Sequence, residues 1–245
     1  MLHKTKGIVL NHLKYGENKL VTNIYTETHG RKAFLIHGLH GHKSKFHPTF
    51  FQPLTLLDLE VNINPKRELQ QVKEINFDYS FQAIPYDNTK RAIALFLAEI
   101  LFKTLKEEES NTSLFNYLFH AIQLLDAKET GIANFHLVFL MNLTKYLGFY
   151  PINNYSETNC IFDPVNGRFY AFISIPSANI DRTLSLGIHR LLTLTFDQLE
   201  TLQLNHQTRN ALLRLIIDFY HIHLGSLGAV KSLPILQSVF EEDEK

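Results

Sequence analysis

The residues best suited to do chemistry are cations gathered at the start of the chain. The first 52 residues contain eight lysines or arginines and two acids, whereas the whole chain contains 24 of each kind. Because lysine and arginine neutralise phosphates, this local surplus predicts a surface for a polyanion, above all nucleic acid. We expect the contacts to come from cations in or beside turns, namely Lys14, Lys19, Arg31, Lys32, Lys43 and Lys45.

A histidine cluster in the same region offers a second chemistry. His37, His40, His42 and His47 have a spacing that metal ligands could use, but no carboxylate or thiol nearby completes a typical site. We favour an exposed polar loop, and whether the segment His37–His42 binds a metal stays open. A metal-dependent enzyme that uses these histidines is therefore an alternative to a binding module.

Other catalytic sites have no visible signature in the sequence. The chain contains no phosphate-binding loop, no dinucleotide fingerprint and no nucleophile elbow. Cys160 is the only cysteine, which excludes an intrachain disulfide and a zinc site built from cysteines. We therefore expect a protein that binds rather than catalyses, without cofactor or metal. A module that binds structured RNA is the main alternative, because basic charge and stacking groups serve both polymers.

The composition is that of a folded protein in water, with 45% hydrophobic and 20% charged residues. No basic segment followed by an apolar segment opens the chain, and no run of eighteen apolar residues occurs. These features predict a cytoplasmic protein without a membrane span.

The first eighty residues read as short strands joined by tight turns. Five short segments between about residues 4 and 77 are apolar runs or alternate apolar with polar residues, and turn residues separate them. Five short strands with little room for a helix predict a small closed or half-closed β-barrel. We place this domain at residues 1–80.

After Pro85 the apolar residues recur at helical spacing, which predicts an all-α domain over residues 81–245. Asp87 or Asn88 is the expected first N-cap, and Gly148 is the expected end of the third helix. The remaining expectations are helices near 93–105, 114–125 and 132–147, an irregular stretch at 152–182, one or two short helices at 191–204 and a longer one near 212–222. An all-β front and an all-α back are typical of an α+β multidomain protein.

Motifs in both halves occur in a recognisable order. The first half carries Lys6-Gly7-Ile8-Val9-Leu10, Tyr15-Gly16-Glu17, Leu20-Val21-Thr22, Tyr25-Thr26, His29-Gly30, the loop from Gly38 to Lys45, and Gln52-Pro53-Leu54-Thr55. The second half carries Leu143-Thr144-Lys145-Tyr146-Leu147-Gly148-Phe149-Tyr150-Pro151, then Cys160 and a turn from Phe162 to Gly167. This order resembles the RecO family of recombination mediators, specifically over the first eighty residues and more loosely beyond.

The resemblance implies an N-terminal five-stranded OB-fold barrel, a C-terminal helical domain and a role in DNA repair and recombination. It implies binding to single-stranded and double-stranded DNA, annealing of complementary strands, and RecA loading on gapped DNA together with RecR. It also implies association with the nucleoid in the cytoplasm. Many members have a four-cysteine zinc site in the helical domain. With Cys160 alone, we expect that site to be degenerate over residues 155–175 and to hold no zinc.

The same resemblance implies a second partner, the acidic tail of single-stranded DNA-binding protein. Such a tail needs a groove that is both apolar and basic. We expect this groove along the helix near residues 132–147, lined by Phe135, Phe139, Lys145 and Arg190.

Overall fold

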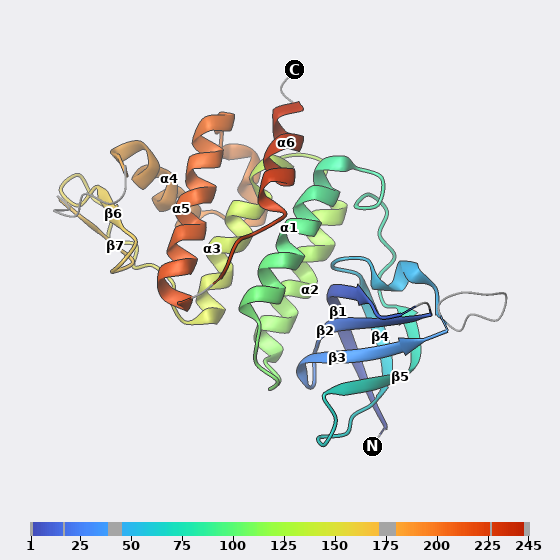
Figure 1. Cartoon of the computed structure of the whole chain (residues 1–245). Helices are drawn as coiled ribbons and strands as arrows, with labels where there is room; N and C mark the ends of the chain where they lie inside the picture. The colour runs from blue at the N-terminus through green and yellow to red at the C-terminus, as the bar shows by residue number, and fades with distance from the viewer. Residues whose placement is uncertain (1, 17, 39–45, 172–179, 226, 243–245) are drawn as a thin grey trace. The chain divides into compact units, whose positions relative to one another are not determined.

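The computed structural model describes residues 2–16, 18–38, 46–171, 180–225 and 227–242 (Figure 1). It divides into two compact units, Met1–Ala127 and Lys128–Lys245. Each unit is described separately below.

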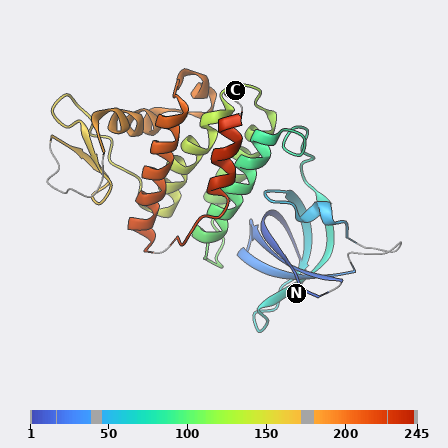
Figure 2. The same cartoon turned by 45° about the horizontal axis from the view of Figure 1, so that its top comes forward.

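The first unit contains a closed five-stranded barrel with the strand order β1-β2-β3-β5-β4 (Figures 1 and 2). All pairs are antiparallel except β3 with β5, which run parallel. This is the arrangement of an OB-fold and confirms the predicted fold class. The strands are β1 (Leu2–Lys14), β2 (Lys19–Thr26), β3 (Gly30–His37), β4 (Leu56–Asn62) and β5 (Leu69–Phe77), with a short 3-10 helix η1 (Pro48–Phe51) before β4.

Strand β1 closes the barrel because it pairs on both edges. Its first half pairs with β4, its second half pairs with β2, and a bulge between Val9 and Asn11 lets the strand bend from one partner to the other. Alternate residues of the strands point inward and form a dry core. That core includes Ile24, Phe34, Phe51, Leu59 and Val61, all of which are fully or almost fully buried.

Two helices complete the first unit, α1 (Asn88–Thr104) and α2 (Thr112–Ala127). The Asp87 side chain accepts a hydrogen bond from the backbone of Lys90 and caps α1, as predicted. The Tyr25 ring, on the outside of the barrel, stacks on Phe115 of α2 with centroids 6.2 Å apart. The barrel and the first two helices therefore belong to the same compact unit.

A buried carboxylate ties the segment before α1 to the end of α2. Asp126 is 2% exposed, and its oxygens accept backbone hydrogen bonds from Gln82, Ala83 and Ile84 at 2.8–2.9 Å. The Tyr79 hydroxyl donates a further bond at 3.3 Å. Three amides and a hydroxyl satisfy the carboxylate, so the segment between barrel and helices is held in place.

The second unit is a helical bundle with a small hairpin. Its elements are η2 (Ile132–Asn134), α3 (Phe135–Leu147), β6 (Ile161–Asp163), β7 (Arg168–Tyr170), α4 (Arg182–Thr193), η3 (Phe196–Thr201), α5 (His206–Leu224) and α6 (Leu233–Glu242). Helix α3 ends at Gly148, where φ is 85°, as its sequence predicted. Inside the bundle, the Tyr220 hydroxyl donates to the Leu140 carbonyl at 2.7 Å.

Three features of this unit differ from the sequence prediction. Helix α4 begins at Arg182, the last residue of the stretch expected to be irregular and well before the helix expected from 191, because Asp181 caps it by accepting from the Leu184 amide at 2.8 Å. A β6–β7 hairpin also forms within that stretch. Helix α6 was not predicted; its Phe240 ring packs between His136, with centroids 5.4 Å apart, and the Arg209 guanidinium at 5.5 Å.

Side chains around the β6–β7 hairpin do not fit a zinc ion. The Asn154 amide pairs with the backbone of Phe169 through two hydrogen bonds of 2.8 and 2.9 Å, as a neighbouring strand would. Asp163 accepts from the amide of Val165 at 2.8 Å and from the Asn166 side chain at 2.6 Å. These polar groups are committed to the turn itself. Across the described residues, no group of three histidine, cysteine or acidic side chains could hold a metal.

None of the helices that the structure describes has both the length and the apolar character needed to cross a bilayer.

Candidate nucleic-acid interface

The outer surface of the barrel differs in charge from one side to the other. We call the outer surface of residues 11–14, 19–26 and 30–37 the β2–β3 face. These three segments contain no aspartate or glutamate. Residues paired across two strands share a face, and here the outward pairs include Lys19 with His37 and Val21 with Leu35. The strands themselves present a partly apolar surface with cations, which is suited to a nucleic-acid backbone and its bases. Glu108, from the segment after α1, does lie against these strands, where it pairs with Lys32.

The opposite side of the barrel carries the acids. We call the outer surface of β4, with the first half of β1 and the paired part of β5, the β4 face. Lys4 lies opposite Glu60, which itself lies opposite Glu74. Lys6 pairs with Asp58 across the strands and forms an ion pair with Asp78 at 2.9 Å. The early cations therefore do not form one continuous surface, which corrects the simplest reading of the charge pattern.

Two predicted DNA-binding lysines lie at the turn between β1 and β2. Lys14 ends β1 and Lys19 begins β2, and both are exposed. The turn between them is closed by a hydrogen bond of 2.9 Å from the Tyr15 amide to the Lys19 carbonyl. Tyr15 is 57% exposed and lines a hollow together with Lys19 and His37. Lys19 lies on the outward side with His37, whereas Lys14 lies opposite Leu20 of the core and so points to the other side of the ladder. An exposed ring beside Lys19 can stack on a base while that lysine contacts a phosphate.

Arg31 and Lys32 contact the chain segment that follows α1. The Arg31 guanidinium donates to the Phe102 carbonyl at 3.0 Å and lies 5.4 Å from the centre of that ring. Lys32 forms an ion pair with Glu108 at 2.5 Å. The segment lies so close to β3 that a Cβ at Gly30 would be 2.8 Å from the Glu107 carbonyl oxygen. In this conformation Arg31 and Lys32 are both engaged in contacts within the chain.

The other two predicted cations, Lys43 and Lys45, lie outside the described residues. His40 and His42 also lie outside the described residues, so the expectation about a metal at His37–His42 falls there as well.

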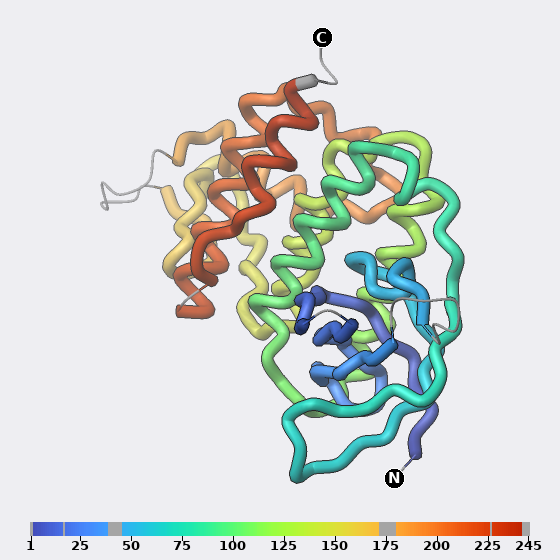
Figure 3. The backbone as a smooth tube through the Cα atoms, turned by 45° about the vertical axis from the view of Figure 1, so that its right-hand side comes forward, coloured from blue at the N-terminus to red at the C-terminus, as the bar shows by residue number. Residues whose placement is uncertain are grey.

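The loop between β4 and β5 provides a cationic rim that the sequence argument missed. Lys66 and Arg67 are exposed in this loop, which projects from the barrel (Figure 3). Leu69 pairs with Ala33 of β3, so the loop joins the outer surface of β3. Ala33 and His37 are four positions apart, which separates the two rims by roughly 13 Å along the strand. A Pro-Lys-Arg sequence in a turn was the available signal, but it lies beyond the basic first 52 residues.

Comparisons with known proteins identify the family. The model for the N-terminal part of recombination protein O matches residues 1–81, and the model for its C-terminal part matches residues 85–234. The chain is 35% identical over 240 residues to a DNA repair protein RecO of Phocaeicola vulgatus, covering 98% of this chain and all of that relative. This chain belongs to the RecO family of DNA repair proteins. A RecO of Bacteroides fragilis is 36% identical over 242 residues, with the same coverage.

The predicted peptide groove of this RecO-family chain is not formed as expected. Phe135 and Phe139 are both 0% exposed, because their helix α3 is covered on that side by the bundle. The Phe135 ring stacks on Phe196 with centroids 4.7 Å apart. Lys145 and Arg190 are exposed, and the Lys145 ammonium lies 4.6 Å from the centre of the Tyr150 ring. The two cations remain accessible, whereas the two phenyl rings belong to the interior.

Proposed function

We propose that this RecO-family chain is a recombination mediator. It binds single-stranded and double-stranded DNA, anneals complementary strands, and helps RecR to load RecA on gaps coated by single-stranded DNA-binding protein. The observation that carries the proposal is the β2–β3 face of an OB barrel, whose own strand residues include no acid, with Lys19 exposed at its end and Lys14 exposed at the same turn. Family membership and the barrel topology support the same reading.

The proposed mechanism rests on charge and requires no nucleotide or catalytic group. Each lysine that neutralises a phosphate releases condensed counterions, so affinity should fall steeply as salt rises. Two strands gathered on one cationic surface repel each other less, which accelerates their pairing. Contacts to the backbone carry no sequence information, so most of the binding energy should be independent of sequence.

The cations divide into two groups in this mechanism. Lys14 and Lys19 are exposed and can meet phosphates directly, and Lys43 and Lys45 are assigned to the same role from the sequence. Arg31 and Lys32 would first have to leave Phe102 and Glu108. We therefore give Lys14 and Lys19 the first role in binding, and Arg31 and Lys32 a role only after they are released.

Strand annealing across a salt series tests the proposal. The assay uses complementary single strands, bare and coated with single-stranded DNA-binding protein, with and without RecR. The doubly substituted Lys14→Ala/Lys19→Ala protein should anneal several-fold more slowly at moderate salt. A matched Lys4→Ala/Lys73→Ala protein, altered beside the acids of β4 and β5, should retain the wild-type rate.

Two outcomes would overturn the proposal. The first is equal annealing by wild type and the Lys14→Ala/Lys19→Ala protein. The second is competition in which structured RNA displaces single-stranded DNA of equal length, which would favour the RNA-binding alternative.

For the acidic tail of single-stranded DNA-binding protein, we propose surface contacts at Lys145 and Arg190. Both cations are exposed in the second unit, on α3 and α4. A labelled tail peptide should bind more weakly to Lys145→Ala/Arg190→Ala than to wild type. Because Phe135 and Phe139 are buried, substituting them should lower stability rather than affect peptide binding selectively. Unchanged peptide affinity in the doubly substituted protein would remove this site.

A further inference from the structure

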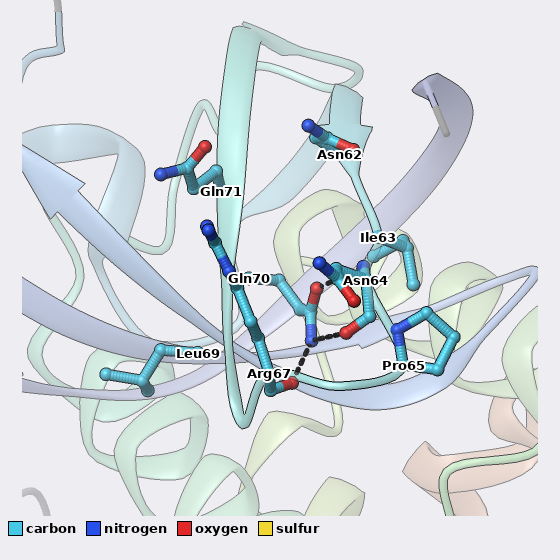
Figure 4. A pocket seen from close by; sticks show the side chains of 8 residues that line it. All are labelled: Asn62, Ile63, Asn64, Pro65, Arg67, Leu69, Gln70 and Gln71. Atoms are coloured by element: carbon cyan, nitrogen blue, oxygen red, sulfur yellow. Dashed lines mark hydrogen bonds between the residues drawn. The ribbon is translucent and has the colours of Figure 1, made fainter.

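A hollow of about 280 Å³ lies under the loop that joins β4 to β5 (Figure 4). Its lining combines amide side chains with one guanidinium and apolar carbons, contributed by Asn62, Ile63, Asn64, Pro65, Arg67, Leu69, Gln70 and Gln71. Amides donate and accept hydrogen bonds, and a guanidinium binds phosphate in a fixed geometry. This set of groups matches the chemistry of a nucleotide.

Gln70 makes the hollow a preformed site. Its side chain is buried at the end of the barrel, where Phe34 is its partner on β3. The side-chain oxygen accepts from the Asn64 amide at 2.7 Å, and the side-chain nitrogen donates to the carbonyls of Asn64 and Arg67 at 3.1 and 2.5 Å. The Asn64 side chain in turn accepts from the Lys66 amide at 3.0 Å. A loop held in this way loses little entropy when it binds a ligand.

The side chains that face the hollow come from paired strand positions. Asn62 and Gln71 are directly opposite each other on β4 and β5, so their amides lie on one surface. Leu69, two residues before Gln71, is on the same surface and is 37% exposed. Figure 4 shows the Arg67 side chain extending along β5 toward Gln71. An apolar platform, a pair of amides and a cation therefore line the same hollow.

We propose that this hollow is a nucleotide subsite for a single strand bound on the β2–β3 face. Arg67 contacts a phosphate, the base rests on Leu69, and Gln71 hydrogen bonds the base edge with Asn62 beside it. The inference rests on the proposed DNA binding and deepens it, because it adds contacts to a base where the rest of the interface contacts the backbone. The affinity for a strand then depends in part on the base that is held in this subsite.

Charge sets the direction in which the strand leaves this subsite. On one side lie Glu60 and Glu74 of the β4 face, which repel phosphates. On the other side Leu69 pairs with Ala33, and β3 leads toward Lys19 along strands that contain no acid of their own. Glu68 is the one carboxylate within the loop and is exposed to solvent, as are the cations Lys66 and Arg67 beside it. The bound strand runs from the subsite over β3 and β2.

The test compares intact and abasic oligonucleotides of ~16 nucleotides by fluorescence anisotropy. Arg67→Gln should weaken binding to both, and the slope of log affinity against log salt should fall by about 0.7, the value for one phosphate contact on a single strand. Gln71→Ala should lower affinity for the intact oligonucleotide by roughly twofold to tenfold, the range expected for one hydrogen bond. It should leave affinity for the abasic oligonucleotide unchanged.

Lys73→Gln is the matched control, since it removes an exposed cation from the same strand next to Glu74 and should leave the slope unchanged. Arg67 and Gln71 are exposed, so thermal unfolding should confirm that both variants fold. The subsite is wrong if Lys14→Ala/Lys19→Ala weakens binding while Arg67→Gln and Gln71→Ala do not. The base contact alone is wrong if Gln71→Ala affects both oligonucleotides equally. Failure of wild type to bind either oligonucleotide would instead refute the proposed function.

Discussion

The ammonium of Lys32 lies 2.5 Å from the carboxylate of Glu108, although 76 positions separate these residues in the chain. The hydrogen bond from Lys32 lowers the pKa of Glu108, and the charges of Lys32 and Arg31 act in the same direction. The carboxylate is largely exposed, so the pair contributes little to stability. Its larger consequence is that Glu108 holds Lys32 in an ion pair, and this lysine could otherwise contact DNA.

Substituting Glu108 should therefore strengthen DNA binding. In Glu108→Gln, Lys32 loses its ionic partner and becomes available to a phosphate, so the salt slope for single-stranded DNA should steepen by about 0.7. Glu109→Gln is the control, because it removes an exposed neighbouring charge of the same sign. If the two variants have equal affinities and slopes, Lys32 does not contact DNA.

Gln70 should stabilise the barrel through the β4–β5 loop. Replacing it with alanine leaves the backbone groups of Asn64 and Arg67 without their partner, at a cost of about 1–3 kcal/mol in the free energy of unfolding. Urea unfolding measures this change. Gln71→Ala, at the exposed neighbouring position, should alter stability by less than about 0.5 kcal/mol. Equal stabilities of the two variants would show that the loop holds its shape without Gln70.

Asp126 should be essential for the segment that connects the barrel to α1. In Asp126→Asn one oxygen acceptor becomes a donor, which sets an amide against the backbone N–H groups of Gln82, Ala83 or Ile84. We expect a loss of about 1–3 kcal/mol and faster amide exchange over residues 79–84. Unchanged protection of these amides would contradict the assignment. Asp87→Asn, at an exposed N-cap position, should be nearly neutral in comparison.

His136 should make the second unit sensitive to acid. Burial, aided by the charge of Arg209, lowers the pKa of His136 to about 3. The folded state keeps this ring neutral while the unfolded chain protonates below about pH 6.5, so stability is complete above that pH and is lost as pH falls. The loss from this residue is about 1.4 kcal/mol per pH unit.

Urea unfolding followed by the helical circular dichroism at pH 5 and pH 7 measures the effect. His136→Leu should show a smaller difference between the two pH values than wild type, even if it is less stable at both. An identical pH dependence in the two proteins would mean that other groups cause it.

Local patterns in the sequence were enough to predict the elements of the fold. Apolar runs and alternation between turn residues indicated all five barrel strands, and Asp87 and Gly148 marked helix ends through their own backbone chemistry. The parallel pairing of β3 with β5 could not be derived residue by residue, since it depends on the closure of the whole barrel. Helix α6 was missed because its stability comes from packing Phe240 against distant residues.

The candidate site was predicted less completely, because charge counts do not show which side of a strand a residue occupies. Lys6 and Lys19 belong to the same basic segment, yet the first pairs with Asp78 and the second lies on strands that contain no acid of their own. Arg31 is bound by a carbonyl 71 positions away, a contact without any local signal. Phe135 and Phe139 were assigned to a groove although a helical stripe of phenylalanines equally well describes a core.

The salt dependence of single-stranded DNA affinity tests the central claim, that the β2–β3 face holds the nucleic acid. The comparison is between Lys14→Gln/Lys19→Gln and Lys4→Gln/Lys73→Gln, which remove the same charge from different sides of the barrel. The account predicts that the slope of log affinity against log salt falls by about 1.4 in the first protein and stays at the wild-type value in the second. Equal slopes in the two proteins would contradict it.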